Sequence, residues 1–157
     1  MVNAQLIFNF VNRNEFMKRY FSALIVIVFC LGVINVSVAS STVSAAVKKS
    51  LQANFQATQA EDLKGIMSTM HSKSPNRAAT QAQLPALFQQ YDLKYELLDY
   101  QFVSVSGEYA IVRVKQYTSK LSGPDFRNNT IDSFMIFRQE NAQWKLWAQT
   151  ILDVEFD

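Results

Sequence analysis

The chain of 157 residues contains one cysteine, one histidine, three prolines and four glycines. A single cysteine cannot form an intramolecular disulfide, and a single histidine argues against the His and Cys clusters of zinc sites. Four glycines leave little room for glycine-rich phosphate-binding loops. An excess of one charge sign is also missing, because 15 basic side chains face 13 acidic ones. These scarcities exclude a polybasic nucleic-acid binder, and we expect neither a metal ion nor another cofactor.

The first 39 residues have the pattern of a targeting signal. Lys18 and Arg19 precede an uncharged apolar stretch, Tyr20–Ile34, and the small residues Ser37 and Ala39 follow it. A basic flank, a short apolar run and small residues at positions −3 and −1 predict a secretory signal peptide that is cleaved after Ala39. If the segment stays uncleaved, its length of about 20 residues suits a single membrane anchor instead.

These patterns divide the chain into residues 1–39, an N-terminal extension and signal peptide, and one domain of residues 40–157. Met17, directly before the basic pair, is the expected translation start. The domain has no cysteine and equal numbers of basic and acidic side chains, so an exported fold would depend on its core alone. We expect a secreted or periplasmic protein that touches a membrane only through an uncleaved N-terminus, and no partner nucleic acid.

Helical periodicity dominates the first half of the domain. Apolar spacing predicts a helix over 44–59, a second that begins near a capping box at Thr58–Glu61, and a third that begins at Ser74-Pro75. Pro85 lies inside the third apolar set, so that helix is either kinked or restarted there. His71 follows the second helix and is expected to cap it at the surface, because a positive charge suits a helix C-terminus.

Residues rich in β-formers follow Asp92. Short turns separate four runs, which favours an antiparallel meander. Helices first and strands afterwards predict an α+β fold, with three N-terminal helices packed on one face of a curved sheet of about four strands. The predicted strands are Lys94–Ser104, Tyr109–Lys120, Arg127–Arg138 and Gln143–Asp153.

Neither face of this sheet is cleanly polar, although the helices can cover only one of them. Large exposed apolar patches usually mark an interface, so we expect a homodimer that packs sheet against sheet. The residues assigned to that uncovered face and to the dimer interface are Tyr109, Ile111, Tyr117, Met135, Phe137, Trp147 and Ile151.

Two segments resemble the nuclear transport factor 2-like superfamily, which includes ketosteroid isomerase and the SnoaL-like cyclases. Gln56–Met67 reads as a helix, a break at a Glu-Asp pair and a second helix, and Phe137–Leu146 reads as a hairpin whose Trp-Lys-aliphatic step opens the last strand. The resemblance implies a cone-shaped, cystatin-like fold with a cavity between helices and sheet, and frequent dimerisation through the outer sheet face. It implies no single chemistry. The catalytic tyrosine and acids of ketosteroid isomerase have no matched positions in this chain.

The candidate site residues come from the residues themselves. Asp132 shares a strand face with Phe134 and Ile136, so it is predicted to point into the cavity as a general base, with a solvated carboxylate near the strand's open end as the alternative. We expect the main function to be non-catalytic: binding of a small apolar ligand, homodimeric assembly, or both. The alternative is a cofactor-independent isomerase, dehydratase or hydrolase. The predicted ligand-binding residues are Tyr91, Tyr95, Tyr100, Gln116, Thr130 and Trp144.

Overall fold

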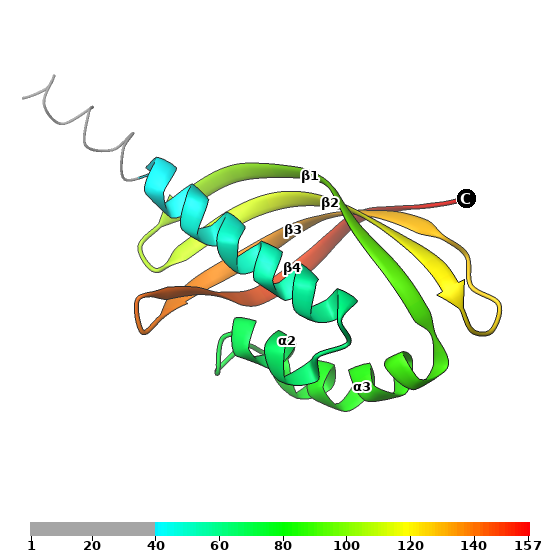
Figure 1. Cartoon of the computed structure of the whole chain (residues 1–157). Helices are drawn as coiled ribbons and strands as arrows, with labels where there is room; N and C mark the ends of the chain where they lie inside the picture. The colour runs from blue at the N-terminus through cyan, green and yellow to red at the C-terminus, as the bar shows by residue number, and fades with distance from the viewer. Residues whose placement is uncertain (1–39) are drawn as a thin grey trace, which may run out of the picture. The chain divides into compact units, whose positions relative to one another are not determined.

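The computed structural model describes residues 40–157, which form one compact unit. The predicted signal peptide, the start at Met17 and the cleavage after Ala39 lie outside the described residues. The observed fold is α+β, as predicted, with three helices packed on one four-stranded antiparallel sheet (Figure 1). A helix over residues 40–59, called the N-terminal helix below, is followed by α2 (Leu63–Thr69), α3 (Arg77–Gln90), β1 (Asp92–Ser106), β2 (Tyr109–Ser122), β3 (Asn129–Glu140) and β4 (Gln143–Phe156).

The helix starts differ in detail from the prediction. Asp62, and not the expected capping box, caps α2, because its carboxylate accepts a hydrogen bond of 2.9 Å from the amide of Gly65. Glu61 adopts a positive φ of 54°, which turns the chain between the first two helices. Helix α3 begins at Arg77, two residues after the expected start at Pro75, and it continues through Pro85. None of the helices over residues 40–157 is long and apolar enough to cross a membrane.

The strands follow one another in the order β1-β2-β3-β4, so every connection is a hairpin. Gly107 has a φ of 56° in the β1–β2 turn, a conformation that glycine adopts without steric cost. The β3–β4 turn uses Asn141 and Ala142, both with positive φ of 50° and 61°. Two consecutive left-handed residues match the twist of the flanking strands, which explains this tight hairpin.

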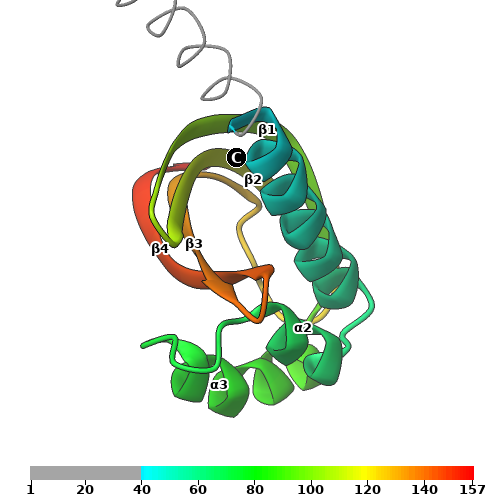
Figure 2. The same cartoon turned by 90° about the vertical axis from the view of Figure 1, so that its left-hand side faces the viewer.

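The N-terminal helix crosses the sheet on one face, called the inner face below; the opposite face is the outer face (Figure 2). Val47 and Leu51 of this helix are 0% and 1% exposed. They pack on Val112 of β2 and Phe137 of β3 as part of the main hydrophobic core. The core therefore depends on one helix face pressed against the two central strands.

Candidate functional site

The inner face holds a small cavity of about 100 Å³ between the N-terminal helix and the sheet. An open groove of about 420 Å³ next to it shares Phe55 and Tyr95 with the cavity, and it runs between the N-terminal helix and β1. Cavity and groove together give a ligand a route from solvent to the inner face. The cavity is lined by Asn54, Phe55, Thr58, Tyr95, Gln116, Met135, Leu146 and Gln149.

None of these lining residues carries a formal charge at neutral pH, and three of them are amides. The amide nitrogen of Gln149 donates to Ser133 at 3.0 Å, that of Gln116 to Thr118 at 3.0 Å, and that of Asn54 to Thr69 at 2.7 Å. Each amide nitrogen uses one of its two N–H bonds on protein, so each side chain keeps its carbonyl oxygen as an acceptor and one N–H as a donor toward a ligand.

Tyr95 is the only titratable residue in the lining. Burial, and then the charge of Glu61, raise the pKa of its phenol above the ordinary value of 10.0. At neutral pH the phenol therefore stays protonated and acts as a hydrogen-bond donor. The lining can orient an uncharged molecule, but it offers no group with the pKa near 7 that general acid–base catalysis favours.

Of the predicted ligand-binding residues, Tyr95 and Gln116 line the cavity and the other four do not. Tyr91 caps the end of α3 and packs on Phe126 at 5.8 Å between ring centroids. The hydroxyl of Tyr100 donates to the carbonyl of Ser44 at 3.0 Å. Thr130 pairs with Tyr117 and so lies on the outer face. Trp144 is 7% exposed and belongs to the core.

Sequence reasoning missed most of the cavity lining, including Asn54, Thr58 and Gln149. A signal for two of them was present, since Asn54 and Thr58 are four residues apart and adjoin the apolar positions Leu51 and Phe55 on the N-terminal helix. Polar side chains at helical spacing beside a buried stripe indicate a polar lining within the core.

Asp132 was predicted to point into the cavity, and that prediction is wrong. It stands opposite Lys115, on the outer face, and its carboxylate accepts two hydrogen bonds from Arg113, at 2.9 Å and 2.6 Å. The hydrogen bonds to Arg113 hold the pKa of Asp132 below its ordinary value, although burial opposes this. An ionised, bidentate carboxylate is engaged by its partner and is a weak base, so Asp132 is not the base of a cavity reaction.

The predicted dimer interface also needs correction. Met135 and Phe137 are 4% and 1% exposed and belong to the core under the N-terminal helix, so they cannot reach a partner across the outer face. Ile151 stands opposite Ser133 and so lies on the inner face, where its side chain is exposed and is not part of the core. Tyr109, Ile111, Tyr117 and Trp147 are the predicted interface residues that lie on the outer side.

Three outer-side side chains, those of Tyr109, Arg138 and Trp147, stack at one end of the sheet, with the guanidinium over the two aromatic rings. The guanidinium of Arg138 lies over Trp147 at 4.8 Å and over Tyr109 at 5.2 Å, and it donates to Glu108 at 2.7 Å. Its Nε atom is buried and has no hydrogen-bond partner among the described residues. Arginine, tryptophan and tyrosine are the residues that most often dominate binding energy at interfaces.

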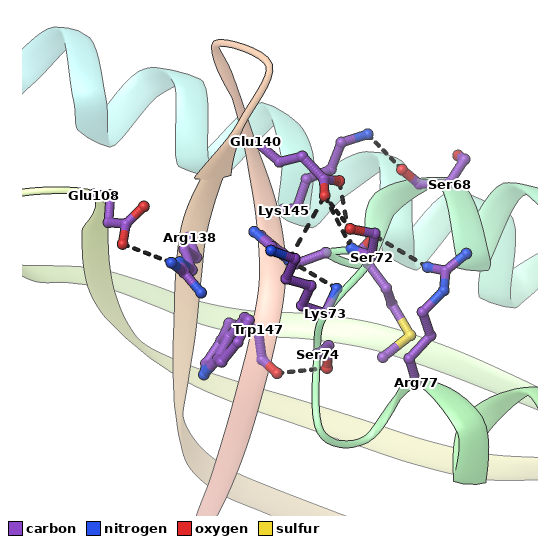
Figure 3. Close-up of polar contacts among 12 residues, drawn as sticks. Ser68, Ser72, Lys73, Ser74, Arg77, Glu108, Arg138, Glu140, Lys145 and Trp147 are labelled. Carbon is purple, nitrogen blue, oxygen red and sulfur yellow. Dashed lines mark hydrogen bonds and ion pairs between the residues drawn. The ribbon is translucent and has the colours of Figure 1, made fainter.

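The segment after α2 closes the edge of β4 beside this stack (Figure 3). Met70 pairs in parallel with Leu146, the amide of His71 donates to the carbonyl of Leu146 at 2.9 Å, and the hydroxyl of Ser74 donates to the carbonyl of Trp147. This short parallel pairing gives β4 a neighbour on its free edge at Leu146 and Trp147.

His71 is 5% exposed, so the expected surface cap is wrong. Its Nδ1 accepts the amide of Lys73 at 3.0 Å and lies 3.7 Å from Glu140, and its ring meets the edge of Trp147 at 5.0 Å. Glu140 accepts hydrogen bonds from Ser72, which lower the pKa of its carboxyl. The hydroxyl of Ser72 donates to Glu140, and Nδ1 of His71 accepts the amide of Lys73, so these side chains hold the linker in place and do not pair as nucleophile and base.

No group of three or more His, Cys, Asp or Glu that could hold a metal ion exists over residues 40–157.

Comparisons with known proteins place this geometry in context. No curated protein matches the chain. The family model described as the anti-sigma-I factor RsgI9, C-terminal domain, matches residues 49–156.

Solved structures with the same fold have low sequence identity. A protein of the nuclear transport factor 2-like family from Streptomyces avermitilis is 18% identical, with a TM-score of 0.58, and the match covers 69% of this chain and 94% of that one. A nuclear transport factor 2-like protein of unknown function from Pseudomonas putida is 11% identical, with a TM-score of 0.59 and coverage of 71% and 86%. A ketosteroid isomerase-like protein from Erwinia carotovora atroseptica is 14% identical, with a TM-score of 0.51 and coverage of 69% and 95%.

These similarities support the nuclear transport factor 2-like fold that the sequence resemblance implies. The family model spans the N-terminal helix from residue 49 through β4, which is more than half of the chain. The chain therefore belongs to the family of the C-terminal domain of anti-sigma-I factor RsgI9, and its fold is nuclear transport factor 2-like.

Proposed function

We propose that residues 40–157 form a non-catalytic binding domain that takes a small uncharged ligand on its inner face. One observation carries the proposal: the cavity lining consists of amides, a threonine, a tyrosine and apolar side chains, without a carboxylate, histidine or lysine. The carboxylate predicted to act there, Asp132, is bound to Arg113 on the opposite face. Binding without chemistry needs only the groups that the lining provides.

The lining also refines the ligand class. A purely apolar ligand, as the sequence suggests, would leave the amide oxygens of Gln116 and Gln149 without hydrogen bonds. A cavity of about 100 Å³ holds only the tip of a drug-sized molecule, whereas the adjoining groove holds about 420 Å³. We therefore propose a ligand with an apolar body in the groove and a donor group, such as a hydroxyl or an amide N–H, at its tip.

The family supports a regulatory role over an enzymatic one. The matching model is named for an anti-sigma factor, and that name describes control of a sigma factor and not a reaction. Several structural neighbours bear provisional dehydratase or hydroxylase names, but at these identities the likeness extends to the fold alone. We propose that ligand binding to this domain serves signalling, in an exported or membrane-anchored protein whose N-terminal targeting pattern is described above.

Homodimerisation through the outer face is the second part of the proposal. It is supported by the stack of Tyr109, Arg138 and Trp147, which combines exposed aromatic surface with a partly unpaired guanidinium. Ile111 of β2 stands opposite Ile136 of β3, and together with the aromatic rings of the stack these two residues form an apolar strip across the two central strands. A second copy that covers the strip would remove it from water.

Native mass spectrometry of the full chain tests both parts. We expect a dimer and a co-purified small molecule. The Gln116→Leu variant removes an acceptor from the cavity and should lose the bound molecule, whereas Gln101→Leu, the same change on the outer-face partner of Arg113, should retain it. A molecule retained equally by both variants would place the ligand elsewhere, and a bound molecule that is released chemically altered would support the enzymatic alternative.

A further inference from the structure

A third hollow lies apart from the cavity and its adjoining groove, between the N-terminal helix, the end of α2 and the β3–β4 hairpin, and has a volume of about 370 Å³. We call it the basic groove, because its charged lining residues are Lys49 and Lys145 and no acid lines it. Its volume falls in the range of about 300–1,000 Å³ that is typical of small-molecule sites. Asn54 lines the cavity and Thr69 lines the basic groove. The hydrogen bond between their side chains lies where the two spaces adjoin, and no residue lines both of them.

The donors of the basic groove identify the chemistry that it can bind. The hydroxyls of Ser68 and Thr69 already donate to carbonyls of their own helix, at 2.7 Å each. The ammonium of Lys145 donates to the carbonyl of Ser68 at 2.5 Å (Figure 3). The donors left for a ligand are the ammonium of Lys49, the hydroxyl of Ser50, the side-chain amide of Gln143 and the two remaining N–H bonds of Lys145.

The two lysines of the basic groove differ in how far a nearby acid compensates their charge. Glu140 lies near enough to Lys145 for that lysine to lower the pKa of its carboxyl, so the charge of Lys145 is partly compensated. Lys49 has no ion-pair partner among residues 40–157 and is exposed. One uncompensated positive charge matches a monoanion, whereas a dianion such as phosphate would leave one of its negative charges unpaired in the groove.

The remaining lining is apolar. Trp144 is 7% exposed yet lines the basic groove, and Ala46 and Ala53 border it from the N-terminal helix at positions i and i+7. A flat indole beside two methyl groups suits an apolar or aromatic body. We propose that the basic groove binds a small organic carboxylate, with the carboxylate at Lys49, Ser50 and Gln143 and the apolar body against Trp144.

The probe pair is benzoate and benzamide, which share one shape and differ in charge. The reporter is the indole N–H signal of Trp144 in the ¹⁵N-labelled full chain, assigned by comparison with the Trp147→Phe variant. We expect benzoate at millimolar concentration to shift this signal saturably, benzamide to have at least tenfold weaker effect, and the signal of Trp147 to stay in place. Equal shifts from both probes, or none up to ~50 mM benzoate, would overturn the proposal.

Two lysines on one helix provide the matched variants. Lys49→Gln should weaken benzoate binding about tenfold, because one charge-assisted hydrogen bond is lost. Lys48→Gln makes the same change one residue earlier, where the ammonium lies 5.4 Å from the ring of Tyr100 and does not line the groove, so it should leave the affinity unchanged. Equal losses in both variants would indicate general attraction to a basic surface. Inorganic phosphate that displaces benzoate at equal concentration would overturn the choice of a carboxylate.

Discussion

Truncation of Phe137 separates a core position from an interface position. Sequence periodicity assigns Phe137 to the outer face, whereas the structure places it at 1% exposure among Val47, Leu51, Ala110 and Trp144. Tyr109 is the matched position, because it lies on the outer side and is 37% exposed. Truncation of each aromatic side chain should therefore affect a different property: folding stability at 137 and self-association at 109.

The expected losses in the free energy of unfolding follow from how deeply each side chain is buried. Replacement of a buried phenylalanine by alanine costs about 3–5 kcal/mol, a large share of the roughly 5–15 kcal/mol that stabilises an ordinary domain. Phe137→Leu is the usable variant, because it keeps most of the apolar volume and should lower the free energy of unfolding by about 1–2 kcal/mol. Tyr109→Ala loses contacts to Trp147 and Arg138 and should cost about 1 kcal/mol or less.

Urea unfolding followed by tryptophan fluorescence measures the first effect, and sedimentation equilibrium measures the second. With a slope of about 1–3 kcal/mol per molar urea, Phe137→Leu should shift the unfolding midpoint down by roughly 0.3–2 M while the association constant stays near that of the parent chain. Tyr109→Ala should show the reverse pattern. An unchanged midpoint together with a lost dimer in Phe137→Leu would refute the face assignment on which this reasoning depends.

Three further predictions concern the turn, the outer ion pair and the N-terminus. Ala142→Gly should raise the free energy of unfolding by about 0.5–1 kcal/mol, because the φ of 61° at Ala142 is unfavourable for any residue with a side chain. The same change inside α3, Ala86→Gly, should lower the free energy of unfolding by about 1 kcal/mol, and thermal melts compare the two variants. The Asp132–Arg113 pair should stabilise the fold above the unfolded-state pKa of about 3.9 and lose that effect as the pH falls through the lower folded-state value, so the urea midpoint of Asp132→Asn should fall less on acidification than that of the parent chain. Intact-mass measurement of the exported protein should give a chain that begins at Ser40; a chain that retains the apolar run in the membrane fraction would favour the anchor.

The fold could be predicted from the sequence because its patterns are local. The change from helical spacing to β-rich runs at Asp92 coincides with the start of β1, and each predicted strand overlaps an observed one. Element ends were less accurate because they depend on single caps. At α2, Asp62 competes with the Thr58–Glu61 pattern and its carboxylate binds Gly65, which a spacing rule does not reveal.

The site was harder to predict because β3 gives no alternation. Phe134, Met135, Ile136 and Phe137 are consecutive apolar residues, so periodicity does not decide which of them face the core. The observed register pairs Val112 with Met135, and a shift by one residue would send every β3 side chain to the opposite face. The candidate base and two of the interface assignments were wrong for this one reason.

Charge would have resolved the register where hydropathy did not. Arg113 and Lys115 share one face of β2, and Asp132 is the one acid within β3 before its last residue, Glu140. Opposite charges on adjacent strands stabilise a sheet when they share a face, so Asp132 belongs with the two cations, and Ser133, Met135 and Phe137 belong on the other side. That single pairing removes the carboxylate from the cavity. It leaves a cavity lined by three amides, a threonine hydroxyl, a phenol and apolar side chains, which is the lining on which the proposal of ligand binding rests.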